Sequence, residues 1–242
     1  MKIGLCGFTI SAAEYYRTFP VLEVQQTFYD PPPLRTISKW RAEAPASFEF
    51  TLKAWQIITH TRTSRTYRRM RTPFTEKERD QFGAFRLNET TKRAWDTTLT
   101  CARALRATAI LLQCPASFKP TEGNIANMQT FVRGVDRPPK VRLLWEPRGE
   151  WPEDVVKSLC SELSLVHVVD PFVNKPTSAE IYWRLHGQGN AYASYTDEEL
   201  AQLREWAAAD PEAYLMFNNI PRVGDAARFR ALAASWDAKS EC

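Results

Sequence analysis

Two segments of the chain alternate between apolar and polar residues, which is the pattern of a β-strand with one apolar and one polar face. The clearer one lies within Ser47–His60, where Phe48, Phe50 and Leu52 alternate with polar neighbours. The other is Val21–Tyr29. A helical segment, Leu34–Glu43, separates them. We therefore predict that the two strands pair in parallel within a right-handed β-α-β unit.

The polar faces of these two strands predict an enclosed, polar interior, because parallel sheets are normally covered on both faces. The residues expected to line it are Glu23, Gln25, Thr27, Glu49, Thr51 and Lys53. Buried charges are costly unless they are paired, so we interpret this face as a candidate site. We expect Lys53 to be held by a carboxylate from a neighbouring strand, with Glu23 and Glu49 as the candidates.

Six further segments are predicted to be strands, and helical segments lie between them. They are residues 2–7, 108–114, 141–145, 165–169, 181–185 and 213–217. Eight strands that alternate with helices predict a TIM-type (β/α)8 barrel with parallel strands; a doubly wound sheet would instead cover the polar strand faces with helices. We expect residues 1–242 to form this single domain, with a basic insertion at about 56–92 after the third strand.

In such a barrel the active site lies where the strands end. The residues at these ends are Cys6, Tyr29, Lys53, Gln113, Glu146, Asp170, His186 and Asn218. Each has a simple structural explanation alone, such as a turn cap for Asp170 or a core position for His186. Gathered at one rim, they favour a functional site.

The predicted insertion is rich in arginine. It contains Arg62, Arg65, Arg68, Arg69 and Arg71, with no acidic residue before Glu76. His60 and Tyr67 lie among them, so the segment fits either a solvated basic loop or a phosphate-binding loop with rings that stack on bases. Because it follows the strand with Lys53, we predict that His60–Arg71 is a lid or clamp for an anionic ligand.

The composition of the chain indicates where the protein is located in the cell and which classes of partner it binds. The net charge of +4, from 32 basic and 28 acidic residues, does not indicate a general DNA coat protein. Five scattered cysteines without a C-x-x-C pair are typical of reduced thiols. No apolar run approaches the ~18 to 20 residues that span a bilayer. We expect a cytoplasmic, monomeric protein with an anionic ligand and no membrane partner.

Short motifs in order along the chain resemble the YecE-like family, domain of unknown function seventy-two (DUF72), and are most similar to its shorter branch in thermophilic archaea. They are C-G-F (6–8), E-V-Q-Q-T-F-Y (23–29), F-x-F-x-x-K-A-W-Q-x-I-T-H (48–60), T-Y-R-R (66–69), W-E-P-R-G (145–149), V-D-P-F (169–172), R-L-H-G (184–187) and F-N-N (217–219). The resemblance implies a TIM barrel distantly similar to those of endonuclease IV and xylose isomerase.

Three functions remain open, and the first is an enzyme that hydrolyses a phosphodiester in nucleic acid. Its predicted catalytic residues are Lys53, Glu146, Asp170 and His186. The residues expected to bind substrate are Glu23, Gln25, Thr27, Tyr29, His60, Arg65, Arg68, Arg69, Gln113, Arg148, Arg184 and Asn218. With only three histidines, a trinuclear zinc site is not expected. One Mg²⁺ or Mn²⁺ on Glu146, Asp170 and His186 is an alternative to metal-free catalysis.

The second function is a sugar or sugar-phosphate converting enzyme, in which Lys53 and Glu146 move protons and Trp55 or Trp145 forms an apolar platform. The third is a nucleic-acid-binding module without catalysis, which needs only the basic surface. Both enzymes, unlike the module, predict strongly shifted pKa values inside the barrel mouth.

Overall fold

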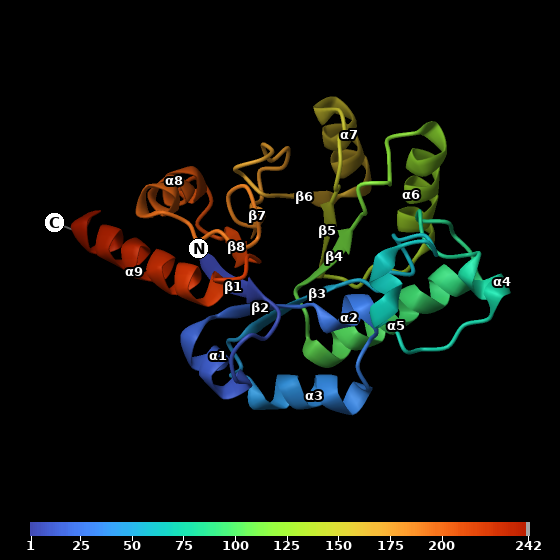
Figure 1. Cartoon of the computed structure of the whole chain (residues 1–242), viewed down its shortest axis with the longest axis horizontal. Helices are drawn as coiled ribbons and strands as arrows, with labels where there is room; N and C mark the ends of the chain where they lie inside the picture. The colour runs from blue at the N-terminus through green and yellow to red at the C-terminus, as the bar shows by residue number, and fades with distance from the viewer. Residues whose placement is uncertain (241–242) are drawn as a thin grey trace.

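Eight parallel strands close into a barrel in the computed structural model, which describes residues 1–240. Each strand pairs with the next along the chain and β8 pairs with β1 (Figure 1). The strands are β1 (Lys2–Cys6), β2 (Val21–Val24), β3 (Glu49–Lys53), β4 (Ala109–Gln113), β5 (Arg142–Glu146), β6 (Leu165–Val169), β7 (Tyr182–Leu185) and β8 (Tyr214–Phe217). The predicted TIM-type barrel is confirmed.

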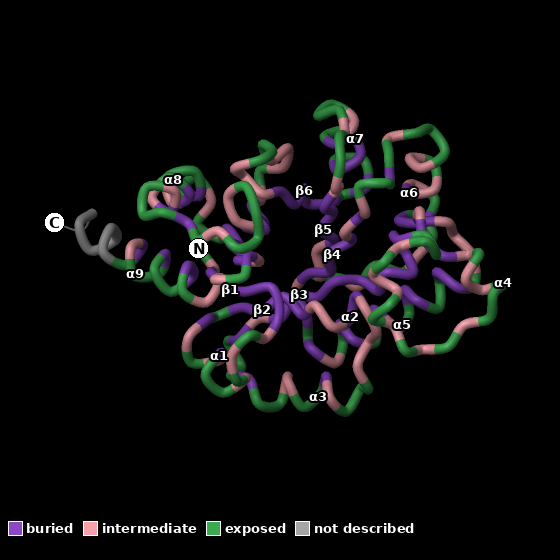
Figure 2. Tube along the Cα trace, viewed as in Figure 1, coloured by how far each residue is buried: buried purple, intermediate pink, exposed green. Residues whose placement is uncertain are grey.

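Helices surround the barrel, and Figure 2 shows buried residues along the strands with exposed ones on the outer helical faces. The helices are α1 (Ala12–Thr18), α2 (Gln26–Tyr29), α3 (Leu34–Glu43), the 3₁₀ helix η1 (Arg65–Arg69), α4 (Glu76–Arg79), α5 (Glu89–Leu105), α6 (Glu122–Gly134), α7 (Glu153–Leu163), α8 (Asp197–Ala207) and α9 (Arg222–Ser240). A capping box formed by Thr196 and Glu199 opens α8. Across residues 1–240, every helix is too short or too polar to cross a membrane.

The second strand is shorter than its alternation predicts. It ends at Val24, and the chain then forms the one-turn helix α2. The Thr27 hydroxyl donates to the backbone carbonyls of Val24 (3.2 Å) and Lys53 (2.7 Å), so it fastens this turn to β3. The prediction of one strand over Val21–Tyr29, with Thr27 on its inner face, is therefore wrong. Four residues of alternating polarity fit a helical turn as well as a strand.

On the other strands the inward residues follow the predicted alternation. The hydroxyls of Thr51 and Tyr182 lie 2.8 Å apart across the interior. Apolar inward residues fill the middle of the barrel; they include Val21, Ala109, Leu111, Leu144, Val166, Val168 and Met216. Outward residues such as Phe50 and Leu52 belong to the larger core between the strands and the helices. The apolar middle layer leaves the charged inward residues at the two ends of the barrel.

Glu49 lies at the amino-terminal end of the barrel, where it pairs with Lys2 at 2.6 Å and accepts a hydrogen bond of 2.5 Å from Tyr214. Burial tends to raise the pKa of Glu49, but Lys2 and Tyr214 outweigh it and lower the pKa. Lys53 is four residues further along β3, roughly 13 Å away at the usual rise of a strand. The prediction that Glu49 could hold Lys53 is wrong for this reason.

The segment 54–88 between β3 and α5 is fastened back onto the chain that leaves β3. Gly83 N donates to Ile57 O at 2.7 Å, and Phe85 N donates to Ile58 O at 2.9 Å. Gly83 has φ +81°, and a Cβ at this position would lie 2.3 Å from Thr61 N. Only glycine fits here. The close contact holds the arginine-rich η1 beside the carboxyl ends of the strands.

Candidate functional site

At the carboxyl-terminal opening of the barrel, here called the mouth, Arg184 of β7 lies between two carboxylates. Its guanidinium is 3.0 Å from Glu23 Oε1 of β2 and 2.6 Å from Glu146 Oε2 of β5. The side chain of Arg184 is 1 % exposed. A third, longer hydrogen bond of 3.4 Å goes to Gln113 of β4. The alternation of β2, β5 and β7 therefore brings these predicted residues together across the barrel.

The ion pairs between Arg184 and the two carboxylates determine which of these groups are charged. Burial favours the neutral acid of Glu146, but Arg184 and Arg148 outweigh it and lower the pKa of Glu146 to about 2. Burial likewise opposes the charge on Arg184, whereas Glu146 and Glu23 raise its pKa well above the usual value. Glu23 also accepts a hydrogen bond of 3.0 Å from Tyr182 and one from Gln25. Glu146 is thus a carboxylate at neutral pH and cannot serve there as a general acid.

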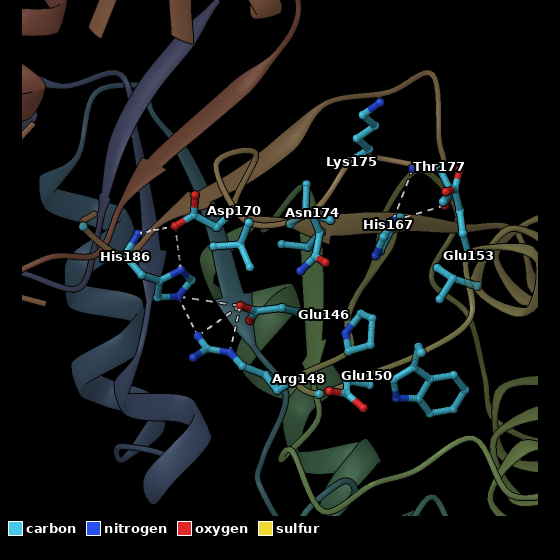
Figure 3. Close-up of a pocket in the computed structure, with 18 residues that line it drawn as sticks. Glu146, Arg148, Glu150, Glu153, His167, Asp170, Asn174, Lys175, Thr177 and His186 are labelled. Atoms are coloured by element: carbon cyan, nitrogen blue, oxygen red, sulfur yellow. Dashed lines mark hydrogen bonds and ion pairs between the residues drawn. The ribbon is translucent and has the colours of Figure 1, made fainter. Parts of the chain in front are cut away.

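A second chain of contacts runs along the rim, from Glu146 through Arg148 and His186 to Asp170 (Figure 3). Arg148 donates to Glu146 Oε1 at 3.0 Å and approaches His186 Nε2 at 2.5 Å. On the other side of the ring, His186 Nδ1 is 3.4 Å from Asp170 Oδ2, which also accepts the His186 backbone N–H at 2.9 Å. Because guanidinium N–H groups only donate, Nε2 must accept and Nδ1 carries the proton.

Lys53 is buried in the mouth and is 3 % exposed. Within the part of the chain that the structure describes, no carboxylate lies within ion-pairing distance of its Nζ, which packs over the Phe28 ring at 3.8 Å. Burial and the charge of Arg184 lower the pKa of Lys53 to about 7, and Glu23 and Glu146 offset only part of this. The predicted pairing with Glu23 is therefore wrong, because Arg184 occupies that carboxylate.

His60 and Tyr29 are the other predicted binding residues near Lys53. His60 is buried, packs edge-on against Phe28 at 4.9 Å, and shares a hydrogen bond of 2.8 Å with Thr59. Burial, together with the charges of Lys53 and Arg148, lowers the pKa of His60 to about 3, so its ring is neutral at pH 7. The Tyr29 ring lies 6.0 Å from Lys53 Nζ. His60 is an inner wall of the mouth and not a surface contact.

Outside the mouth lies the arginine edge, which we define as the exposed residues Arg65, Arg68 and Arg69 of η1. Among the side chains of residues 1–234, none of the three pairs with a carboxylate, whereas the nearby Arg62 pairs with Glu76 and Asp80. The Arg69 guanidinium stacks on the Tyr29 ring at 3.9 Å. The predicted basic loop thus has three cations that are available to a ligand.

The two expected tryptophan platforms meet a different geometry. Trp145 is fully buried against Trp151 outside the barrel, and Trp55 is buried against Phe74, so neither forms a platform in the mouth. The Asn218 backbone is tied to β7 by a hydrogen bond of 2.7 Å from its N–H to Leu185 O.

The donor set at the rim does not fit the metal alternative. Both oxygens of Glu146 accept from guanidinium groups, which place positive charge where a cation would bind. No group of three or more His, Cys, Asp or Glu side chains that could hold a metal ion occurs among the described residues. The set of Glu146, Asp170 and His186 is better suited to holding protons and arginines.

A cavity of about 650 Å³ opens beside the mouth, between the segments that follow β5, β6 and β7. Glu146, Arg148, Asp170 and His186 line one part of it, and His167 and Thr177 line another. His167 was not predicted as a site residue, because it lies on the outward face of β6, where periodicity predicts core packing.

Comparison with known proteins gives one family. The family model described as "Protein of unknown function DUF72" matches residues 11–241. The UPF0759 protein YunF of Bacillus subtilis (strain 168) is 36% identical over 76 residues, which are 31% of this chain and 24% of that protein. The match thus spans about a quarter of the length of this relative.

Solved structures match over nearly the whole chain. A DUF72 family protein from Enterococcus faecalis V583 has a TM-score of 0.71 at 19% identity, covering 97% of both chains. Endonuclease IV from Thermus thermophilus matches with a TM-score of 0.57 at 9% identity, covering 99% of this chain and 100% of that one. A xylose isomerase domain containing protein from Salmonella typhimurium LT2 matches with a TM-score of 0.59 at 11% identity, covering 97% of this chain and 96% of that one. These likenesses show the fold alone.

Proposed function

Because the chain belongs to the DUF72 family of proteins of unknown function, we propose its function from the chemistry of the site. We propose that it is an enzyme that acts on a phosphate-bearing substrate at the barrel mouth. The substrate that we favour is the phosphodiester of a nucleic acid, and the reaction is its hydrolysis.

A continuous cationic path supports this proposal. It begins at the arginine edge, passes through the stack of Arg69 on Tyr29 at 3.9 Å, and reaches Lys53 Nζ 6.0 Å from the same ring. Exposed guanidinium groups without carboxylate partners bind phosphate through paired hydrogen bonds. The path extends outside the mouth, so it suits a polymer with several phosphates better than a small phosphate ester.

The mouth also has the groups that hydrolysis needs. His186 Nε2 is the unprotonated nitrogen of a ring that Asp170 orients, and it accepts from Arg148. When Arg148 turns this N–H to a bound phosphate, Nε2 can take the proton of a water that attacks phosphorus. Lys53, with a pKa of about 7, can give a proton to the oxygen that leaves when the P–O bond breaks. Arg148 contributes positive charge to the phosphoryl oxygens in the transition state.

The sugar-converting alternative loses one of its supports, because Trp55 and Trp145 are buried away from the mouth. The alternative of a module without catalysis predicts no role for Lys53 or His186. Both alternatives can be separated from the proposal by measuring binding and cleavage in the same set of variants.

The binding experiment compares labelled single- and double-stranded oligonucleotides across a salt series. In the wild type we expect affinity to fall steeply as salt rises. With Arg65, Arg68 and Arg69 all changed to Ala, the log–log slope should decrease in magnitude by about 2 to 3, the effect of three lost phosphate contacts.

A matched control removes the same charge elsewhere, with the exposed Arg17, Arg103 and Lys157 changed to Ala on α1, α5 and α7. This control loses the same three positive charges as the triple variant, so it shows the effect of net charge alone. We expect its salt slope to be close to that of the wild type. Equal slopes in the triple variant and the wild type would contradict a nucleic-acid ligand at the arginine edge. Tight binding of a small phosphate ester with weak binding of all oligonucleotides would instead support a sugar phosphate.

A further inference from the structure

One part of the cavity, on the outer side of β6, is lined by His167. This residue lies on β6, opposite Trp145 of β5, and its side chain faces the helical layer and not the barrel interior. It is 6 % exposed and lines the same cavity as Arg148 and His186. Nothing in the proposed hydrolysis uses His167.

The protonation of the His167 ring is fixed by its neighbours. Thr177 N is 3.2 Å from His167 Nδ1, and the Thr177 hydroxyl is 3.1 Å from the same atom (Figure 3). A backbone N–H can only donate, so Nδ1 accepts and Nε2 carries the proton. Burial lowers the pKa of His167 to about 4, although Glu146 opposes this, so the ring is neutral at pH 7.

His167 Nε2–H has no hydrogen-bond partner among residues 1–234. Because His167 lines the cavity, its N–H is open to an acceptor there, which water or a ligand can supply. This part of the cavity therefore has a neutral donor whose orientation is already set by Thr177.

The walls between His167 and the mouth are largely apolar. They include Pro147, Trp151, Val156 and Val169. Trp151 is fixed by a hydrogen bond of 3.1 Å from its Nε1 to Phe118 O. The polar and charged lining residues Glu150, Glu153, Asn174 and Lys175 are exposed. Apolar walls with one inner donor suit a flat heterocycle better than a sugar, whose several hydroxyl groups would each need a partner.

We propose that this cavity is a subsite for the nucleobase of the substrate, with a carbonyl oxygen or ring nitrogen of the base accepting a hydrogen bond from His167 Nε2. The phosphate of the same nucleotide lies at the other part of the cavity, beside Arg148 and His186. This placement rests on the proposed function and specifies which part of the ligand each part of the cavity binds.

Two variants test the subsite without removing the phosphate contacts. In His167→Asn the side-chain oxygen can still accept from Thr177 N, but the Nε2 donor is lost. In Val173→Trp a large ring is added at a residue that is 74 % exposed on the cavity rim, so it should obstruct the cavity without disturbing the core. Val173→Ala is the control, and thermal unfolding of each variant checks the fold.

The probes are uridine 5′-monophosphate, ribose 5-phosphate and uridine, measured by calorimetry or, for weak binding, by saturation-transfer NMR. The wild type should bind the nucleotide at least tenfold more tightly than ribose 5-phosphate. His167→Asn should reduce this advantage about fivefold to tenfold, the effect of one neutral hydrogen bond, and Val173→Trp should abolish it. Binding of ribose 5-phosphate should be the same in all variants.

Equal affinity of the wild type for the nucleotide and for ribose 5-phosphate would overturn the subsite, as would equal losses for both ligands in His167→Asn. The uridine measurement separates the two proposals. Binding of uridine that Val173→Trp removes supports the subsite even if no phosphate ligand binds, in which case only the proposed function fails. If phosphate ligands bind and uridine does not, the subsite fails and the proposed function stands.

Discussion

Replacing Lys53 by Met should make the protein more stable at low pH and should flatten the pH dependence of its stability. The unfolded chain binds the Lys53 proton with a pKa of 10.5, whereas burial and Arg184 lower the pKa to about 7 in the folded protein. Between these values the unfolded state holds more protons. Stability from this residue therefore rises with pH over this window and is lost as pH falls through about 7.

The size of the effect follows from the shift. Each pH unit well inside the window changes the free energy of unfolding by about 1.4 kcal/mol, and the slope fades below pH 7. From pH 6 to pH 8.5, Lys53 should therefore add about 2 kcal/mol to the stability of the wild type, as an order-of-magnitude figure. Met has a similar length and can pack on Phe28 without a charge, so the variant lacks this rise.

The assay is urea unfolding of wild type and Lys53→Met at pH 6, 7, 8 and 8.5, with the difference between the two proteins plotted against pH. Burial raises the pKa of thiols such as Cys6 and Cys114, which makes the folded protein less stable as pH rises. This effect is the same in both proteins and cancels in the difference. Lys39→Met, at an exposed site on α3, is the control and should parallel the wild type. Parallel profiles for wild type and Lys53→Met would refute the buried, unpaired amine.

Three further predictions concern the mouth and its support. Arg184→Met should destabilise the protein by about 3 to 5 kcal/mol, because it leaves Glu23 buried without an ion-pair partner and leaves Glu146 with Arg148 alone. Arg184→Lys should recover little of this, since one ammonium cannot reproduce the fork between two carboxylates. Chemical denaturation measures both. Gly83→Ala should lower the unfolding midpoint and weaken oligonucleotide binding together, because the added Cβ would meet Thr61 N at 2.3 Å; normal binding and stability would contradict this. If Lys53 is the general acid, cleavage rates at saturating oligonucleotide should fall as pH rises above about 7, and a rate that keeps rising to pH 9 would assign its role to another group.

The architecture and the position of the site could be predicted from the sequence, because both depend on local patterns. Alternation in β3 placed Thr51 and Lys53 inside the barrel. Glu146 ends β5 and His186 directly follows β7, which placed both at one rim. In a closed parallel barrel these positions follow from the topology alone.

The pairing of charges could not be predicted, because it depends on the stagger between strands. Glu23, Glu49 and Lys53 all have the same inward parity, but Glu49 is two inward levels below Lys53, and Arg184 reaches Glu23 from across the barrel. The role of His167 was hidden for another reason. Its outward position predicts core packing, and the cavity beside it is formed by loop segments whose conformation the alternation of the strands does not specify.

Cleavage of an end-labelled oligonucleotide under single-turnover conditions tests the central claim most directly, with wild type, Lys53→Met and the arginine-edge triple variant compared at equal fractions of bound substrate. The proposal predicts that the wild type cleaves and that bound substrate is cleaved at least 100-fold more slowly by Lys53→Met. The triple variant should cleave at the wild-type rate once the higher concentration needed for binding is supplied. A wild type that binds the oligonucleotide and leaves it intact, or a Lys53→Met variant that cleaves as fast as the wild type, would contradict it.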